Sequence, residues 1–260
     1  MGEYLDVAVE VSLKAGRLVK DMSKEILSVT LKGEVDLVTE VDVISETLIV
    51  DGLKARFPNH GFLAEERGGI QVESDYTWII DPIDGTTNYA HSFPVYAVSV
   101  GLEYKGEVIV GVIYDPNLDE LFTAEKGRGA FLNNEPIRVS SVSELDRSLL
   151  ATGFPYYFRK DPERILRYFT DFSLKAQGIR RAGAATIDLT ALACGRFDGY
   201  WELGLKPWDM AAGTLIASEA GARITKLDGS KLDIRVPEIL ATNDLIHDQM
   251  LEIIGESLGR

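Results

Sequence analysis

The spacing of apolar residues along the chain predicts several amphipathic helices. Apolar and small residues recur every three or four positions from residue 3 to about 24, as on the buried face of a surface helix. The same spacing between Val41 and Leu53 predicts a second helix, with Thr39 as its N-cap and its end before Pro58. A polar break at Lys32–Glu34 separates the two. Further helices are expected over residues 162–176, 186–194, 208–220 and 245–254.

The periodicity changes to two in the middle of the chain. Apolar and polar residues alternate from Val95 to Ile137, and turn residues at 105–106 and 115–117 interrupt the pattern. This arrangement predicts an antiparallel meander rather than a run of parallel βαβ units. Short strands are also expected over residues 62–64, 76–80 and 197–201, the second of them stopping at Asp81-Pro82.

Helical and strand patterns are mixed over the whole length, without repeats, linkers or low-complexity segments. They predict an α+β protein in which helices are layered on a mixed, largely antiparallel sheet. A chain of 260 residues suits a single folded unit, 1–260. Within it we expect an N-terminal lobe over about residues 1–142 and a C-terminal lobe over about 143–260.

Composition narrows the class of protein. Hydrophobic residues make up 45% and charged residues 26% of the chain, which excludes disordered and fibrous proteins. A net charge of −14 repels phosphate backbones, so we expect no direct nucleic-acid binding. No apolar run approaches the length of a membrane-spanning helix, so no membrane partner is expected. The single cysteine, Cys194, and the acidic Glu3 and Asp6 at the N-terminus favour a cytoplasmic protein without a signal peptide.

The stretch WIIDPIDGTTN holds the most informative chemistry. An apolar strand delivers Asp81 to its end, and a sharp turn favoured by Pro82 would let Asp84 converge on the same point. The carbonyl of Ile83 would face that point too. Oxygen ligands of this kind suit Mg²⁺ or Mn²⁺. An ordinary Asp-Pro turn followed by an Asp-Gly turn is the structural alternative.

The next residues, Gly85, Thr86 and Thr87, can begin a helix. The free N–H groups of its first turn would then form an anion site beside the metal ligands. Metal ligands joined directly to a phosphate-binding turn indicate phosphoryl-transfer chemistry.

Three other segments supply acidic residues. Glu65 and Glu66 follow a short apolar strand, Asp42 lies in DLVTEVD at the start of a predicted helix, and Asp209 lies in the first turn of another helix, in PWDMAAG. Each has a structural explanation by itself: a solvated turn, helix capping, or compensation of the helix dipole. Their presence together with DPIDGTTN favours one metal site.

In this order and spacing, DLVTEVD, AEE, DPIDGTTN and PWDMAAG resemble the inositol monophosphatase family, over essentially the full chain. This family belongs to the lithium-sensitive, metal-dependent phosphatase superfamily, which also contains fructose-1,6-bisphosphatases and nucleotide phosphatases. The resemblance implies a layered α/β/α/β/α sandwich, a homodimer, and two or three Mg²⁺ ions in each active site, with Mn²⁺ as a substitute.

The resemblance also assigns roles to individual residues. It implies that the metal ligands are Glu65, Asp81, the Ile83 carbonyl, Asp84 and Asp209. Asp42 and Thr86 resemble the pair that orients and activates the attacking water, with Glu65 sharing a metal-bound water. Gly85, Thr86 and Thr87 match the phosphate-contacting turn, and Asp84 and Asp209 are expected to contact the substrate as well. Gly183, Ala184 and Ala185 match a substrate-side loop, and Glu202 matches an acid that hydrogen-bonds polyol hydroxyls. Ala184 departs from the family, because many members have Ser or Thr there, so one hydroxyl contact to substrate is expected to be absent.

These features favour a Mg²⁺-dependent phosphomonoesterase acting on a small sugar or cyclitol phosphate, and Glu202 favours inositol-1-phosphate. Bridging metals would bind the attacking and leaving oxygens of an in-line displacement by water, so no nucleophilic side chain is required. Arg180 and Arg181 could bind a second phosphate, which keeps a fructose-1,6-bisphosphatase or dual-activity enzyme as an alternative; a solvated basic pair is the structural explanation. A protein that binds the transcription machinery, as bacterial members of the family can, is an alternative of another class.

Overall fold

The computed structural model describes residues 2–23, 29–31, 37–70, 74–160 and 162–258, so Lys32–Glu34 and Asp36 of the predicted motifs lie outside it. The helices are α1 (Glu3–Met22), α2 (Glu40–Arg56), α3 (Thr86–Ala90), α4 (Glu163–Ser173), α5 (Ala185–Ala193), α6 (Pro207–Glu219) and α7 (His247–Leu258), with 3-10 turns at Leu145–Arg147 and Tyr156–Arg159. The predicted helices are all present, with ends that differ by a few residues. Among the described helices, none has the length and apolar character needed to cross a bilayer.

An eight-stranded sheet is formed by strands between residues 61 and 137, within what we call the N-terminal lobe, in the order β10-β9-β8-β7-β6-β5-β3-β4. Its strands are β3 (Gly61–Ala64), β4 (Gly68–Ile70), β5 (Tyr76–Asp84), β6 (Ala97–Tyr104), β7 (Glu107–Asp115), β8 (Glu120–Glu125), β9 (Ala130–Leu132) and β10 (Glu135–Ile137). The predicted meander is confirmed, because β5 to β10 pair antiparallel in chain order. Among the strand pairs of this sheet that the structure describes, β3 and β5 alone run parallel. A separate hairpin joins β1 (Val29–Leu31) and β2 (Leu37–Thr39).

A five-stranded sheet is formed by strands between residues 149 and 242, within what we call the C-terminal lobe, in the order β12-β11-β13-β15-β14. Its strands are β11 (Leu149–Thr152), β12 (Gly178–Arg180), β13 (Gly199–Leu203), β14 (Arg223–Thr225) and β15 (Glu238–Thr242). Strand β11 pairs in parallel with β12 and β13, whereas β15 runs antiparallel to both of its neighbours. Both sheets are therefore mixed, as predicted.

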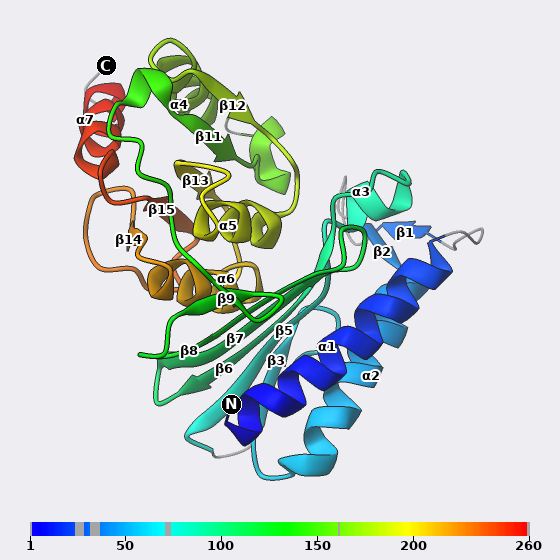
Figure 1. The fold of residues 1–260 in the computed structure, drawn as a ribbon. Coiled ribbons are helices and arrows are strands. Elements are labelled where there is room, and N and C mark those ends of the chain that lie inside the picture. Colours follow the sequence, from blue (N-terminus) through cyan, green and yellow to red (C-terminus); the bar gives the residue numbers. More distant parts are fainter. Residues whose placement is uncertain (1, 24–28, 32–36, 71–73, 161, 259–260) are drawn as a thin grey trace.

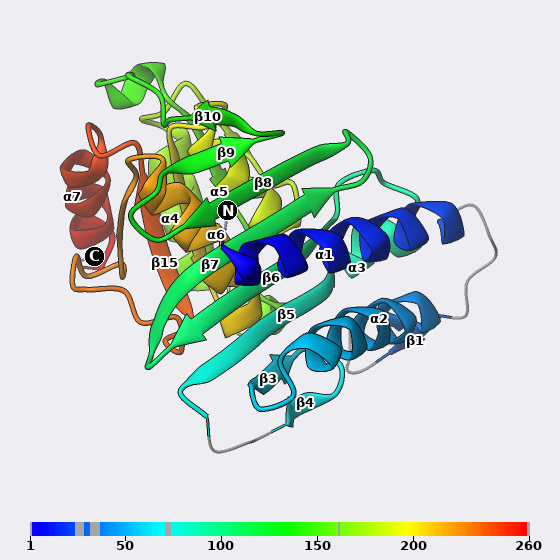
Figure 2. The same cartoon turned by 60° about the horizontal axis from the view of Figure 1, so that its bottom comes forward.

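Helices and sheets alternate in five layers (Figure 1). Helices α1 and α2 pack on the outer face of the large sheet, and α6 contacts its inner face across β6 and β7. Helix α5 lies beside α6 and contacts the small sheet, whose other side carries α4 and α7. Figure 2 shows α1 and α2 running side by side over the large sheet. The predicted α/β/α/β/α sandwich is confirmed, with α5 and α6 as its central layer.

The start of α2 follows the sequence prediction. Thr39 accepts a hydrogen bond from the backbone of Asp42, and the Asp42 carboxylate accepts one from the backbone N–H of Thr39 at 2.8 Å. This reciprocal capping satisfies N–H groups that a helix start leaves unpaired. It also fixes Asp42, which is fully buried, at a defined point beneath the end of β5.

The prediction that the strand after Tyr76 stops at Asp81-Pro82 is wrong, because β5 continues to Asp84. Asp81 pairs with Ser99 and Asp84 with Ala97, so Pro82 and Ile83 together oppose a single residue of β6. This is a β-bulge, which tolerates a proline because the bulged backbone needs no ladder donor there. Side chains three positions apart point to opposite faces of a regular strand. The bulge removes that alternation and puts Asp81 and Asp84 on the same side.

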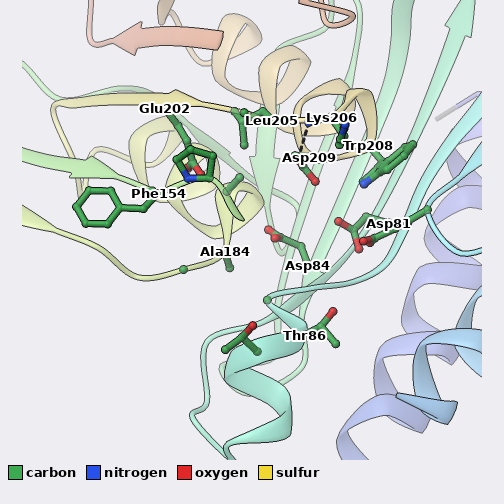
Figure 3. A pocket seen from close by; sticks show the side chains of 18 of the residues that line it. Asp81, Asp84, Thr86, Phe154, Ala184, Glu202, Leu205, Lys206, Trp208 and Asp209 are labelled. Atoms are coloured by element: carbon green, nitrogen blue, oxygen red, sulfur yellow. Dashed lines mark hydrogen bonds between the residues drawn. The ribbon is translucent and has the colours of Figure 1, made fainter. Parts of the chain in front are cut away.

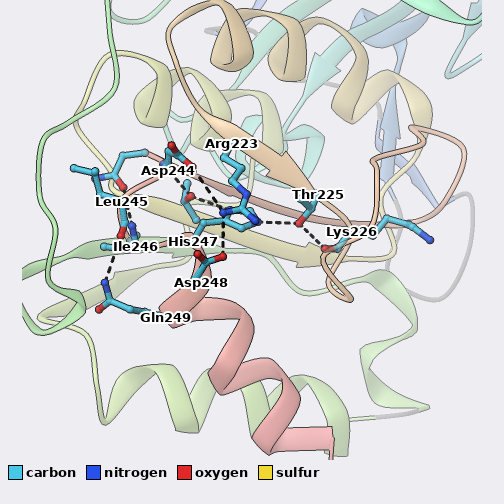
Figure 4. A network of polar contacts seen from close by, with 11 residues as sticks. Arg223, Thr225, Lys226, Asp244, Leu245, Ile246, His247, Asp248 and Gln249 are labelled. Atoms are coloured by element: carbon cyan, nitrogen blue, oxygen red, sulfur yellow. Dashed lines mark hydrogen bonds and ion pairs between the residues drawn. The ribbon is translucent and has the colours of Figure 1, made fainter.

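A buried histidine ties the start of α7 to the small sheet (Figure 4). The Nδ1 of His247 lies 2.9 Å from the Thr242 hydroxyl and its Nε2 lies 3.0 Å from the Thr225 hydroxyl. Arg223 pairs with Asp248 at 3.0 Å beside it. The last helix is thus held by polar contacts as well as by its apolar face.

Candidate active site

One pocket of about 210 Å³ lies where the end of β5 and the first turns of α3, α5 and α6 meet (Figure 3). Its lining from the N-terminal lobe is Glu65, Asp81, Ile83, Asp84, Gly85, Thr86 and Thr87. Its lining from the C-terminal lobe includes Gly153, Phe154, Arg181, Gly183, Ala184, Ala185, Glu202, Lys206, Trp208 and Asp209. The structure therefore brings every predicted metal-ligating residue to one place, although these come from three separate segments of the chain.

Two of the carboxylates are held by backbone donors close in sequence. Asp81 Oδ1 accepts a hydrogen bond from the N–H of Ile83 at 3.0 Å, across the bulge. Asp209 Oδ2 accepts one from the N–H of Lys206 at 2.7 Å, at the start of α6. In each case one oxygen is fixed by the backbone, so the orientation of the other oxygen is set as well.

The electrostatics of this pocket disfavour bare carboxylates. Asp81 is 1% exposed, and burial together with repulsion from Glu65 and Asp84 raises its pKa well above the ordinary value. Burial, followed by repulsion from Asp84, also raises the pKa of Asp209 well above its ordinary range. Carboxylates gathered in this way are stabilised by a cation that neutralises them.

Asp42 and Thr86 form the contact that the resemblance implies. Thr86 Oγ1 lies 3.1 Å from Asp42 Oδ1 and 3.0 Å from the carbonyl oxygen of Ile83. The other oxygen of Asp42 accepts hydrogen bonds from both the N–H and the hydroxyl of Thr39. Asp42 itself is not part of the pocket lining and reaches it through the Thr86 hydroxyl.

The turn at Gly85 requires glycine. Gly85 has φ of +96°, in the left-handed region, and a Cβ there would come within 2.8 Å of the Val95 carbonyl oxygen. This turn allows α3 to begin directly after the strand, so that Thr86 and Thr87 line the pocket. The predicted phosphate-side turn thus stands at the pocket, next to Asp84.

The opposite wall carries Glu202. Its carboxylate accepts a hydrogen bond from the Tyr200 hydroxyl at 2.6 Å, and a Cβ at Gly153 would overlap it. Burial raises the pKa of Glu202 to about 7, and the bond from Tyr200 opposes this shift. Glu202 is thus a tightly held acceptor that faces the same space as Asp84 and Asp209 (Figure 3).

Of the two arginines predicted to bind a second phosphate, one lines the pocket and the other does not. Arg181 lines the pocket, with its guanidinium carbon 5.9 Å from the centre of the Phe154 ring. Arg180 is exposed at the end of β12, where it donates to the carbonyl of Ile179, and it lies outside the pocket lining. Gly183, Ala184 and Ala185 do line the pocket, as expected.

Sequence reasoning missed several residues of the site. Lys206 and Trp208 line the pocket, and their adjacency to Asp209 was a usable signal. Phe154 comes from the loop after β11, and Thr186 contacts Asp84 from α5. Thr186 directly follows the predicted substrate-side residues Gly183–Ala185, which was a usable signal, whereas nothing local distinguishes Phe154 from an ordinary loop residue.

The residues present fit a hard divalent cation. The pocket offers carboxylate oxygens and a backbone carbonyl, without sulfur or imidazole ligands among its lining, which is the donor set of Mg²⁺ and Mn²⁺. As placed, the described residues contain no group of three or more acidic, histidine or cysteine side chains close enough to hold one ion. The fit therefore rests on donor chemistry and charge.

Comparison with known proteins agrees with this geometry. The model of the inositol monophosphatase family matches residues 1–258. The chain belongs to this family. It is 45% identical over 254 residues to the inositol-1-monophosphatase of Synechocystis, covering 97% of this chain and 88% of that protein. It is 42% identical over 260 residues to the Nus factor SuhB of Vibrio cholerae, covering 99% and 97%.

Solved structures of similar sequence share the fold of this chain. The extragenic suppressor protein SuhB of Bartonella henselae superposes with a TM-score of 0.93 at 40% identity, covering 97% of this chain and 98% of that one. Membership of the inositol monophosphatase family confirms the predicted fold and the predicted class of enzyme, a phosphatase.

Proposed function

We propose that this member of the inositol monophosphatase family hydrolyses the phosphate monoester of a small polyol, with inositol monophosphate preferred, and requires Mg²⁺ or Mn²⁺. The main support is the arrangement of the pocket, in which the buried carboxylates of one lobe face Glu202 of the other. The names of relatives at 39–45% identity add to it.

The cations would be held by the residues that the family resemblance assigns: Glu65, Asp81, the Ile83 carbonyl, Asp84 and Asp209, for two or three ions. When bound, such ions supply the positive charge that activates water and stabilises the transferring phosphoryl group. The chain supplies their positions, because Asp81 and Asp209 are each fixed through one oxygen.

Proton removal from the attacking water falls to Thr86 and Asp42. The Thr86 hydroxyl would accept the proton at Oγ1 and donate its own to Oδ1 of Asp42, which lies 3.1 Å away. The hydrogen bonds from Thr39 keep Asp42 in place on its other side. No nucleophilic side chain is needed for this reaction.

Substrate recognition would divide between the lobes. The first-turn N–H groups of α3, from Gly85 to Thr87, would bind the phosphate, and Glu202 would accept hydrogen bonds from the polyol hydroxyls. Arg181 stands where a second phosphate could be bound, so fructose-1,6-bisphosphate remains the alternative substrate. Arg180 lies outside the pocket and adds nothing to that alternative.

The deciding test is phosphate release with and without cation. With Mg²⁺, inositol monophosphate should be hydrolysed faster than fructose-1,6-bisphosphate or adenosine bisphosphate, and chelation should abolish the activity reversibly. Asp84→Asn should reduce turnover by about 100-fold or more, because it removes a charged ligand, while the circular dichroism spectrum and melting curve stay native. Full activity in the presence of chelator, or in Asp84→Asn, would contradict the proposal.

A role in transcription is the second candidate function. The observation that favours it is the name of the Vibrio cholerae relative, Nus factor SuhB. Chelation separates the two candidates, since a scaffold role would survive it and catalysis would not. We also propose that the chain forms a homodimer, which sedimentation equilibrium can measure.

A further inference from the structure

Thr186, in the first turn of α5, makes an unusual pair of contacts across the two lobes. Its backbone N–H and its hydroxyl both donate to the same oxygen of Asp84, Oδ2, at 2.7 Å and 2.6 Å. The two residues are 102 positions apart in sequence. Thr186 is fully buried, so water does not compete for these bonds.

These contacts decide which part of Asp84 is available. Two short bonds to a carboxylate are charge-assisted and hold it in one rotamer. Both bonds from Thr186 go to Oδ2, so the other oxygen of Asp84, Oδ1, is not bonded to Thr186 and can face a cation. Asp84 lines the pocket and is 9% exposed there. Thr186 therefore sets the orientation of the Asp84 carboxylate from the first turn of α5.

Repulsion from the neighbouring carboxylates opposes this orientation of Asp84. Asp81, Asp84 and Asp209 line the same pocket, and like charges gathered there repel one another. Without its partner, Asp84 would gain rotamer freedom and turn away from the other acids. A hydrogen-bond donor behind a ligand carboxylate prevents this.

We propose that Thr186 is a positioning residue that holds Asp84 ready to bind the catalytic cation. This inference rests on the proposed cation dependence. It adds a residue from the polyol-side lobe to the cation site, directly after Ala185 of the substrate loop.

Helix α5 offers a matched control. Thr190 lies one turn further along α5, is also buried, and donates its hydroxyl to the carbonyls of Thr186 and Ile187. Replacing either threonine by valine removes one buried hydroxyl from the same helix. Only Thr186→Val removes a bond to Asp84.

The experiment measures Mn²⁺ binding directly, by the electron paramagnetic resonance signal of free Mn²⁺, in the full chain. Thr186→Val should weaken binding by about tenfold, because supporting bonds to metal ligands have effects of this order. Thr186→Ser should bind like the parent, since it keeps the hydroxyl. Thr190→Val should also bind like the parent, even if both valine variants melt lower.

Three outcomes would overturn the inference. Thr186→Val could bind Mn²⁺ as tightly as the parent or more tightly, which would mean that the hydroxyl does not position the carboxylate or competes with the ion. Equal weakening in Thr186→Val and Thr190→Val would assign the effect to the stability of α5. A parent chain that binds no Mn²⁺ would remove the proposed cation dependence itself, and this inference with it.

Discussion

Glu202 is an acidic, half-buried side chain that lies between protein groups and the pocket. The Tyr200 hydroxyl donates to it, the backbone of Gly153 packs against it, and the pocket lies on its remaining side. Its pKa, raised to about 7 mainly by burial, leaves the carboxyl poised between its charged and neutral forms at neutral pH. Such a group suits recognition of hydroxyls, because either form accepts a hydrogen bond.

Glu202→Gln should therefore change substrate affinity more than bond cleavage. We expect KM for inositol monophosphate to rise by the equivalent of about 1–3 kcal/mol, because glutamine lacks the carboxylate charge and its NH2 group cannot accept a hydrogen bond from a hydroxyl, with a smaller effect on kcat. Steady-state kinetics on this substrate and on a phosphate ester without hydroxyls would measure the difference.

The second substrate is the control, since its KM should be nearly unchanged. Arg181→Ala offers a complementary comparison, because it should impair hydrolysis of a bisphosphate more than that of a monophosphate. Equal losses on all substrates would show that these side chains support the fold rather than recognition.

For single residues, the sequence located the acids of the pocket but not the residues that contact them from distant segments. Asp81, Asp84 and Asp209 stand in motifs with local signals, such as a strand end or a helix start, and all three line the pocket. Thr186 and Phe154 reach the site through contacts between distant segments. No pattern of neighbouring residues encodes such a contact, so only the fold reveals it.

Among the helices, α7 depends on a buried polar anchor. His247 is fully buried, and both ring nitrogens contact threonine hydroxyls of the small sheet (Figure 4). Burial, reinforced by the positive charge of Arg223 and opposed by Asp248 and Asp244, lowers the pKa of His247 to about 4. The histidine is therefore neutral in the folded protein at neutral pH.

This anchor should make stability fall in mild acid. In the unfolded chain the imidazole has its ordinary pKa of about 6.5, so between pH 6.5 and 4 the unfolded state binds more protons than the folded state. The free energy of unfolding should decrease as the pH falls through this window. Urea unfolding at pH 7.5 and pH 4.5 would measure the decrease.

His247→Gln isolates the contribution of the imidazole, since the acidic residues titrate in both proteins. The variant should lose less stability than the parent over the same pH interval, by about 1–3 kcal/mol. An identical loss in both proteins would mean that His247 is protonated without cost.

The whole molecule is organised around its central helices. Helix α6 packs on the large sheet through Ala212 and Ile216, and α5 packs on the small sheet through Leu189 and Leu192. At the end of α5, Arg196 forms a two-pronged ion pair with Glu120 of β8. Both helices belong to the C-terminal lobe in sequence, yet one of them completes the core of the N-terminal lobe.

The two lobes should therefore unfold together. Calorimetry should give one transition, with equal calorimetric and van't Hoff enthalpies, because separating the lobes would expose the apolar face that α6 covers. Fragments 1–142 and 143–260 should not fold separately. Two resolved transitions, or a fragment with native circular dichroism, would show that the boundary near residue 142 divides independent domains.

The order in which the helices and the two sheets are layered could be predicted from the family resemblance but not from the residue patterns. Alternating residues predicted the meander of β6 to β10, since its pairs are close in sequence. The parallel pairs of β3 with β5 and of β11 with β12 and β13 join distant segments. Strand patterns specify which face is apolar, but they do not specify which strand is the neighbour.

The bulge in β5 makes chain length a part of the chemistry. Adding or deleting one residue between Asp81 and Asp84 would change the bulge, and with it the positions of the Ile83 N–H that holds Asp81 and of the Ile83 carbonyl that contacts Thr86. The hairpin turn at Lys105-Gly106, in contrast, is exposed and has open space around it, so it can absorb extra residues. Related chains can therefore differ in length at the exposed turn of this hairpin. Between Asp81 and Asp84 we expect their length to be constant.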